Sequence, residues 1–240
     1  MKIEGRNAIH ELLKTDKEID KILVQKDLKD DASKRLINII KSKRVKLQLV
    51  DKYVIEKESE GKRSQGFIAF VSDYKYFDLE DIIEDAKEKD GFIVVLNEIL
   101  DPHNLGSIIR VCECAGVDGI VIGKDRSASV SDTVMRISAG ALNHVKVARV
   151  VNINTAIEKL KENGYWVYGL EIDGGEIYKT DLKGKLVLVI GGEDSGVKKL
   201  TKSKCDGVVK IPMCGKVNSL NASVACGIAV FEALRQRTGK

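Results

Sequence analysis

Residues 185–192 read KLVLVIGG, five consecutive apolar residues followed at once by two glycines. Similar apolar runs recur through the second part of the chain with helix-like spacers between them: FIVVL (92–96), GIVIG (119–123), VKVARVV (145–151), YWVYGLEI (165–172) and GVVKIPM (207–213). Mostly apolar runs that recur in this way are typical of parallel strands buried on both faces by helices. The pattern predicts an α/β domain with a mostly parallel sheet over residues 90–240.

The first 72 residues have a different pattern, in which shorter helix-like and strand-like segments alternate. The segments are GRNAIHELL (5–13), KILVQ (21–25), ASKRLINIIKSK (32–43), VKLQLV (45–50) and GFIAFV (66–71). They predict a separate compact α/β module over residues 1–72. Residues 73–89 are acidic with few large apolar side chains, which predicts a linker that contains one short amphipathic helix.

Composition limits the class of protein. With 240 residues and 43% hydrophobic content, the chain can bury proper cores. No window reaches the roughly 18 unbroken apolar residues that a membrane-spanning helix needs, and Met1 is followed by polar residues, so we expect a cytoplasmic protein. The five cysteines lack paired CxxC spacing and stand in apolar stretches, which predicts reduced core cysteines and no metal site.

The positive charge is concentrated near the N-terminus. Residues 1–75 carry 18 Lys and Arg against 13 Asp and Glu, whereas the remainder carries 22 against 23. The cluster Lys41, Lys43, Arg44 and Lys46 suits contact with the phosphates of a nucleic acid. The alternative is an ordinary solvated, lysine-rich surface.

A parallel sheet often binds a nucleotide at the carboxyl ends of its strands. The usual phosphate-binding patterns are missing here, because the sequence has neither GxGxxG after the first strand nor GxxxxGK[ST]. A nicotinamide-dependent dehydrogenase and a P-loop nucleotidase are therefore disfavoured.

Polar residues gather in three segments that follow apolar runs: LDPHNLGSIIRVCECAG (100–116), VIGGEDSGV (189–197) and IPMCGKVNSLNASVACGIAVFEALRQR (211–237). We expect Pro102 to end the first extended run and a helix entered near Asn104 to present Arg110. Glu193 falls on a glycine-rich turn, and Ser219 is placed to cap the long last helix. Taken singly, these residues also fit helix caps, a surface ion pair and tight turns.

The three segments resemble, in their order and in their residues, the three motifs of SpoU-class RNA methyltransferases, the TrmH family within the SPOUT superfamily. The resemblance extends along nearly the whole chain, because GRNAIHELL and RSQGFIAFV (63–71) are similar to the N-terminal domain of members that methylate large-subunit ribosomal RNA, the RlmB group. It implies an L30e-like RNA substrate-binding domain over 1–72 and a methyltransferase domain with a deep trefoil knot over 90–240. It also implies methylation, dependent on S-adenosylmethionine, of the ribose 2′-hydroxyl of a guanosine in 23S ribosomal RNA.

The resemblance assigns residues to the site and predicts a homodimer through the catalytic domain. It implies five catalytic residues: Asn104, Arg110, Glu193, Ser219 and Asn221. It implies four positions that grip the cofactor, mainly through backbone groups: Gly191, Ile211, Met213 and Leu220. Three positions depart from the usual family pattern: Asn97 stands in place of an aspartate, Asp194 in place of a glycine, and Ser64 in place of a histidine.

Two alternative functions stay open. The same class modifies transfer RNA, although such members commonly lack the N-terminal module that is complete here. The chain could also be a non-catalytic RNA-binding assembly factor that kept the fold, because a fold alone does not prove an activity.

Overall fold

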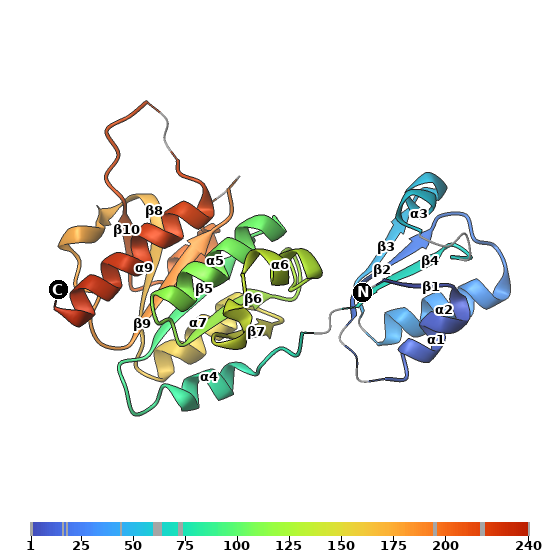
Figure 1. The fold of residues 1–240 in the computed structure, drawn as a ribbon, viewed down its shortest axis with the longest axis horizontal. Coiled ribbons are helices and arrows are strands. Elements are labelled where there is room, and N and C mark those ends of the chain that lie inside the picture. Colours follow the sequence, from blue (N-terminus) through green and yellow to red (C-terminus); the bar gives the residue numbers. More distant parts are fainter. Residues whose placement is uncertain are drawn as a thin grey trace. The chain divides into compact units, whose positions relative to one another are not determined.

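The structure is a computed structural model that describes residues 2–15, 17, 19–43, 45–59, 64–71, 74–193, 196–216 and 219–239. The chain divides into two compact units, Met1–Lys75 and Tyr76–Lys240 (Figure 1). Arg44 and Asp194, which the sequence analysis singled out, lie outside the described residues.

The first unit is built on a four-stranded mixed sheet of order β1-β4-β2-β3. Strands β2 and β3 are parallel, and β4 runs antiparallel to β1 and β2. The elements in chain order are β1 (Lys2–Glu4), α1 (Arg6–Leu12), β2 (Ile19–Gln25), α2 (Asp31–Ser42), β3 (Leu47–Val50), α3 (Lys52–Glu58) and β4 (Phe67–Val71). The unit is therefore an α/β module.

Helices cover both faces of this small sheet because the side chains of β2 alternate between them. Ile22 and Val24 pack in one core with residues of α1 and α2. Leu23 packs in a second core with Ile55 of α3. Helix α2 begins where the Asp30 carboxylate accepts a hydrogen bond from the Ser33 backbone nitrogen at 3.0 Å.

The second unit contains a six-stranded sheet of order β10-β8-β9-β5-β6-β7, in which every neighbouring pair is parallel. This confirms the predicted α/β fold with a mostly parallel sheet. The strands are β5 (Phe92–Asn97), β6 (Gly119–Gly123), β7 (Lys146–Val150), β8 (Trp166–Glu176), β9 (Leu186–Gly191) and β10 (Gly207–Lys210). The trefoil knot stays a prediction from the resemblance.

Helices lie on both faces of this sheet, as the buried strands β5 and β9 require. The helices are α4 (Leu79–Asp85), α5 (Pro102–Cys114), α6 (Asp132–Ile137), α7 (Ile153–Glu162), α8 (Lys199–Lys204) and α9 (Ala222–Thr238), with short 3-10 turns η1 (Ala141–Asn143) and η2 (Ile177–Lys179). Ile93 and Val95 of β5 share a core with residues of α4 and α7. Helices α5 and α9 pack against each other side by side (Figure 1).

Residues 76–89, which the sequence analysis placed in a linker, pack with the second unit. The expected short helix is α4, and its Leu79 and Ile82 are buried in the core beneath the sheet. Phe77 forms a parallel bridge with Ala148 of β7, and the Val130 backbone nitrogen donates to the Tyr76 hydroxyl at 2.7 Å. The segment has few apolar residues, and its composition therefore suggested an unpacked linker. Those few residues are enough to attach it to the second unit.

All five cysteines are free, but the expectation that they lie in the core holds only in part. Cys112 of α5 and Cys226 of α9 are buried with their sulfur atoms 4.0 Å apart, and burial raises the pKa of the Cys112 thiol well above its ordinary value. Cys205 is half-buried. Cys114 and Cys214 are exposed, because the apolar stretches that contain them also have a solvent-facing side.

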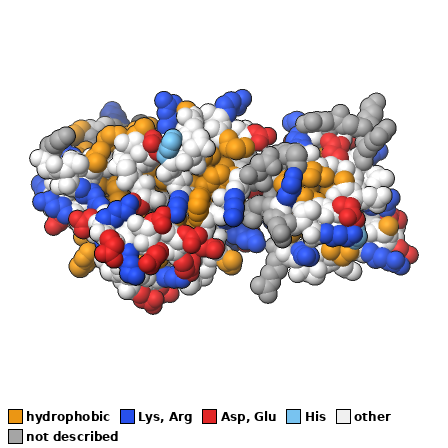
Figure 2. Space-filling model, turned by 60° about the horizontal axis from the view of Figure 1, so that its bottom comes forward, with side chains coloured by type: hydrophobic (Ala, Val, Ile, Leu, Met, Phe, Trp, Pro, Cys, Tyr) orange, Lys and Arg blue, Asp and Glu red, His pale blue; other side chains and the backbone are white. Residues whose placement is uncertain are grey.

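Charges of both signs are interspersed on the second unit. Examples are the ion pairs Lys87–Glu84 at 3.2 Å and Lys161–Asp206 at 2.7 Å. On the face shown in Figure 2, the larger unit likewise mixes basic and acidic side chains instead of separating them by sign. This mixture agrees with the near-neutral charge of residues 76–240, so the basic surplus belongs to the first unit.

Candidate active site

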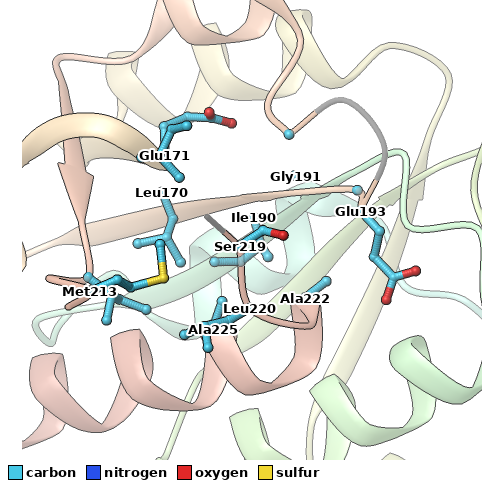
Figure 3. A pocket seen from close by; sticks show the side chains of 14 residues that line it. Leu170, Glu171, Ile190, Gly191, Glu193, Met213, Ser219, Leu220, Ala222 and Ala225 are labelled. Carbon is cyan, nitrogen blue, oxygen red and sulfur yellow. The ribbon is translucent and has the colours of Figure 1, made fainter. Parts of the chain in front are cut away.

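A cavity of about 410 Å³ lies at the carboxyl end of β9, beside the middle of β8 (Figure 3). Strand β9 is inserted between β8 and β5, so segments distant in sequence meet at this edge of the sheet. The wall is largely apolar and is formed by Leu170, Glu171, Ile172, Ile190, Gly191, Gly192, Glu193, Gly196, Ile211, Met213, Ser219, Leu220, Ala222 and Ala225.

The four residues that the sequence analysis assigned to the cofactor all line this cavity. They are Gly191, Ile211, Met213 and Leu220. Figure 3 shows the Met213 and Leu220 side chains beside Leu170, which gives the cavity an apolar side. Gly191 sits where a Cβ atom would overlap the backbone of Gly196 and Val197, so only glycine lets the strand end approach the loop this closely.

A closed set of hydrogen bonds joins the three sequence motifs at one end of the cavity. The Asn104 side-chain amide donates to the Glu193 Oε1 atom at 2.6 Å. The Asn221 amide donates to the same Glu193 oxygen and to the Asn104 Oδ1 atom, at 2.9 Å each. We refer to Asn104, Glu193 and Asn221 as the amide–carboxylate cluster; it fixes the direction of the Glu193 side chain.

Two helix N-termini hold this cluster, and both differ from the sequence-based expectation. Helix α5 begins at Pro102, with Asp101 accepting from the His103 backbone nitrogen at 2.8 Å, so proline starts the helix that was expected to begin near Asn104. Helix α9 is capped by Asn221, which accepts from the Ser223 backbone nitrogen at 2.9 Å, and not by Ser219. Ser219 instead lines the cavity. The polar residue nearest the first helical turn takes the cap in both cases.

Arg110 is the one predicted site residue that belongs neither to the cavity wall nor to the amide–carboxylate cluster. It is exposed on α5 and does not belong to the cavity wall. Six residues separate it from Asn104, so at 3.6 residues per turn it lies about 240° around the helix from the buried amide. The structure therefore brings together Asn104, Glu193, Ser219 and Asn221, and leaves Arg110 facing solvent.

Two residues that the sequence analysis did not assign to the site hold the loop that follows β9. The Glu171 carboxylate, in the middle of β8, accepts a hydrogen bond from the Val197 backbone nitrogen and lines the cavity. The buried Asn97 side chain accepts from the Lys198 backbone nitrogen at 2.8 Å. An acidic residue directly after the apolar YWVYGL run was the only sequence signal for Glu171.

The structure explains how asparagine can replace the usual aspartate at position 97. The role of Asn97 in this contact needs only a side-chain oxygen acceptor, which asparagine and aspartate both provide. The replacement therefore keeps the contact with the loop after β9 and removes a buried negative charge.

Neither a metal site nor a membrane span is found within the described residues. No group of three or more His, Cys, Asp or Glu side chains there is placed to hold a metal ion. In the same part of the chain, no helix combines the length and apolarity that crossing a bilayer requires.

Comparisons with known proteins identify the family. Residues 91–231 match the SpoU rRNA Methylase family, and residues 2–77 match the model described as RNA 2'-O ribose methyltransferase substrate binding. The chain is 39% identical over 238 residues to a TrmH family tRNA/rRNA methyltransferase of Staphylococcus aureus, covering 98% of this chain and 96% of the relative. It is also 39% identical to the Bacillus subtilis relative YacO, covering 97% and 94%.

A solved structure supports the fold over the full length. The SpoU methyltransferase AviRb from Streptomyces viridochromogenes, solved with its cofactor AdoMet, aligns with a TM-score of 0.65 at 22% identity, covering 100% of this chain and 91% of AviRb. The family model spans more than half of the chain, and the curated relatives align along almost all of it. The chain therefore belongs to the SpoU family of RNA methyltransferases.

Proposed function

We propose that this protein transfers the methyl group of S-adenosylmethionine to the ribose 2′-hydroxyl of a guanosine in 23S ribosomal RNA. The observation that carries the proposal is the amide–carboxylate cluster at the end of a largely apolar cavity. The cluster contains one residue from each of the three motifs. Family membership supports RNA methylation, and the nucleotide and the class of RNA are our inference.

The cavity suits S-adenosylmethionine. Adenine and the methionine chain need a shaped and mostly apolar cleft, which Leu170, Met213 and Leu220 supply. Glu171 adds a carboxylate in the wall, and carboxylates are common acceptors for ribose hydroxyls. Gly191, Ile211, Met213 and Leu220 would hold the cofactor, which supplies an electrophilic methyl group and departs as a neutral thioether.

The residues of the chain must then orient a poorly acidic hydroxyl and assist the loss of its proton. Asn104 and Asn221 both bind Oε1 of Glu193, so the second oxygen of that carboxylate is the one left to meet the nucleotide. Ser219 adds a hydroxyl to the wall of the same cavity. Arg110 cannot serve as a base because a guanidinium does not lose its proton in proteins. We assign it to holding a phosphate of the target strand.

We favour ribosomal RNA over transfer RNA because the chain has a complete N-terminal unit that matches a substrate-binding model, and members that modify transfer RNA commonly lack this unit. Mass spectrometry of nucleosides tests this. A strain that lacks the gene should lose one 2′-O-methylguanosine from 23S ribosomal RNA, and purified protein should restore it with S-adenosylmethionine. Loss from transfer RNA instead would overturn the ribosomal target. Loss from neither RNA would favour the assembly factor.

We also propose a homodimer through the catalytic domain. Helix α9 exposes Val224 and Phe231, with 51% and 48% of their surface accessible, although the helix packs on α5. Exposed apolar side chains on one helix fit a self-complementary contact. Light scattering should give twice the mass of the chain, and Phe231→Glu should shift the protein toward monomer. A wild-type monomer at micromolar concentration would contradict the proposal.

We predict that residues 76–240 alone bind S-adenosylmethionine with the affinity of the full chain, as calorimetry can measure. Every residue of the cavity wall lies in this unit. A fragment that starts at residue 90 lacks the buried Leu79 and Ile82, and losing such side chains costs about 2–5 kcal/mol each. It should melt at a lower temperature. A folded 76–240 fragment without cofactor affinity would count against the cavity assignment.

We predict that replacing Lys43 and Lys46 by glutamate weakens RNA binding and flattens its dependence on salt. Both lysines are exposed beside the C-terminal end of α2, and each phosphate contact contributes to the salt slope. Filter binding between 50 and 200 mM salt measures this, and calorimetry should show unchanged cofactor affinity. A wild-type salt slope in the variant would mean that these lysines form only a solvated surface.

A further inference from the structure

A second cavity of about 250 Å³ adjoins the proposed cofactor cavity, and Gly192 and Glu193 line both. The rest of its wall comes from the end of β5, the start of α5 and the loop after β9: Glu98, Ile99, Leu100, Asp101, Asn104 and Lys198. Asn104 and Glu193, two members of the amide–carboxylate cluster, therefore line this second cavity. None of the roles assigned above uses Glu98 or the cavity that it lines.

We propose that this second cavity receives the base of the target nucleotide and that the Glu98 carboxylate selects guanine there. The inference rests on the proposed methyltransferase function and assigns recognition of the target base to Glu98. A base in this cavity places its ribose beside Glu193, at the wall shared with the cofactor cavity. That is where the 2′-hydroxyl must lie for transfer.

The charge of the cavity favours a ligand that donates hydrogen bonds. Its wall contains the carboxylates of Glu98, Asp101 and Glu193 against the single ammonium of Lys198. A phosphate would be repelled by this excess, whereas the polar edge of a base is neutral. The Leu100 side chain, which is 62% exposed, can meet the flat face of a base.

Guanine is the base whose pairing edge matches a carboxylate. Its N1–H and N2–H groups are adjacent donors, and a carboxylate offers two oxygens at a similar separation. Adenine, cytosine and uracil each place an acceptor next to the donor on this edge. An acceptor that faces a carboxylate oxygen is repelled, so the same residue that binds guanine rejects the other bases.

Glu98 is held by its surroundings in an unusual backbone conformation. Its φ of 62° lies in the left-handed region, which is uncommon for a residue with a side chain and recurs at functional sites. A Cβ atom on Gly192 would overlap the Glu98 carbonyl oxygen, and the Gly192 backbone nitrogen donates to the Asn97 carbonyl at 3.0 Å. The turn that carries Glu98 is thus packed directly against the turn that leads to Glu193.

The Glu98 carboxylate is oriented but keeps acceptor capacity. Lys198 Nζ lies 3.1 Å from Oε2, and an Arg126 guanidinium nitrogen lies 3.6 Å from Oε1. The side chain remains 21% exposed. Each carboxylate oxygen accepts about two hydrogen bonds, so one cation on each leaves a position for the base. Arg126 does not line the cavity and its side chain is 80% exposed.

The test uses the full-length protein and two synthetic RNAs that span the methylated position, which mass spectrometry of RNase fragments maps once nucleoside analysis has identified the product. One carries guanosine and the other inosine, which keeps N1–H and lacks the N2 amino group. We expect the wild type to methylate the guanosine RNA with a kcat/KM at least about tenfold above the inosine RNA, the factor that one charge-assisted hydrogen bond contributes. Glu98→Gln should lower kcat/KM for guanosine by at least about tenfold and should reduce the guanosine preference to about twofold or less.

Arg126→Gln is the matched control, because it removes an ion-pair partner of Glu98 outside the cavity wall. It should keep both the rate and the guanosine preference, as exposed ion pairs contribute little. Cofactor affinity, measured by calorimetry, should change by less than about threefold in both variants, which shows that they are folded.

Several outcomes would overturn the inference. If Glu98→Gln keeps the wild-type preference for guanosine over inosine, Glu98 does not select the base. If Arg126→Gln loses as much kcat/KM as Glu98→Gln, the effect belongs to the ion pair. A mapped product on adenosine, cytidine or uridine would overturn the guanine assignment while leaving the methyltransferase intact. A wild-type protein that binds the cofactor but methylates no RNA would instead refute the proposed function, and the inference with it.

Discussion

Replacing Arg110 by alanine is expected to reduce the single-turnover rate of methyl transfer by about a hundredfold or more, which corresponds to roughly 3 kcal/mol of transition-state stabilisation. Arg110 projects from α5 into solvent, away from the buried Asn104 on the same helix. We proposed that it holds a phosphate of the target strand from outside the cavity. A planar guanidinium fork can bind a phosphate at two points, which would fix the strand that carries the reacting ribose.

Arg110→Lys should lose most of the turnover as well, because an ammonium is a single point charge. Affinity for S-adenosylmethionine should stay within several-fold in both variants, since Arg110 is not part of the cavity wall. Rates measured at saturating RNA and cofactor separate the chemical step from binding.

Arg136→Ala is the matched control for Arg110, because it removes another exposed arginine, on the neighbouring helix α6. It should change the single-turnover rate by less than about threefold. Near wild-type methylation by Arg110→Ala at saturation would show that Arg110 is structural, and our account of its role would be wrong. An equal loss in both variants would indicate general electrostatic attraction of RNA.

Replacing Gly191 by alanine is expected to weaken binding of S-adenosylmethionine by about tenfold to a hundredfold. The added methyl group would overlap the backbone of Gly196 and Val197, which cannot move aside as a flexible side chain can. Overpacking of this kind costs about 1–3 kcal/mol, and here the strain falls on the loop that forms the cavity wall. Calorimetry measures the affinity, and thermal unfolding shows whether the variant is folded.

Gly215→Ala is the matched control for Gly191→Ala, because it lies in the loop before Ser219 with open space around its Cβ position and is not part of the cavity wall. Its affinity should stay within about twofold of the wild type. A folded Gly191→Ala protein with wild-type affinity would contradict the assignment of this cavity to the cofactor.

The local sequence determined the fold class and the outline of the elements. FIVVL and LVLVI (186–190) are apolar at every position, and only a parallel sheet covered on both faces buries such strands completely, so neighbouring residues carry the whole signal. Helix starts were less well determined. Asp101 and Asn221 cap helices that were expected to begin at other residues, because several polar side chains compete for each cap and tertiary packing selects one.

The three motifs were visible in the sequence, but their contacts were decided by the tertiary structure. Asn104 lies 89 residues from Glu193 and 117 residues from Asn221, and no local periodicity encodes a hydrogen bond over that distance. Glu171 and Glu98 became candidates only when β8, β9 and β5 were placed side by side. Arg110, predicted beside the same ribose, lies on another face of α5 because a helix turns about 240° over six residues. The sequence therefore determined which residue types follow each strand, and the order of the parallel strands decided which of them meet.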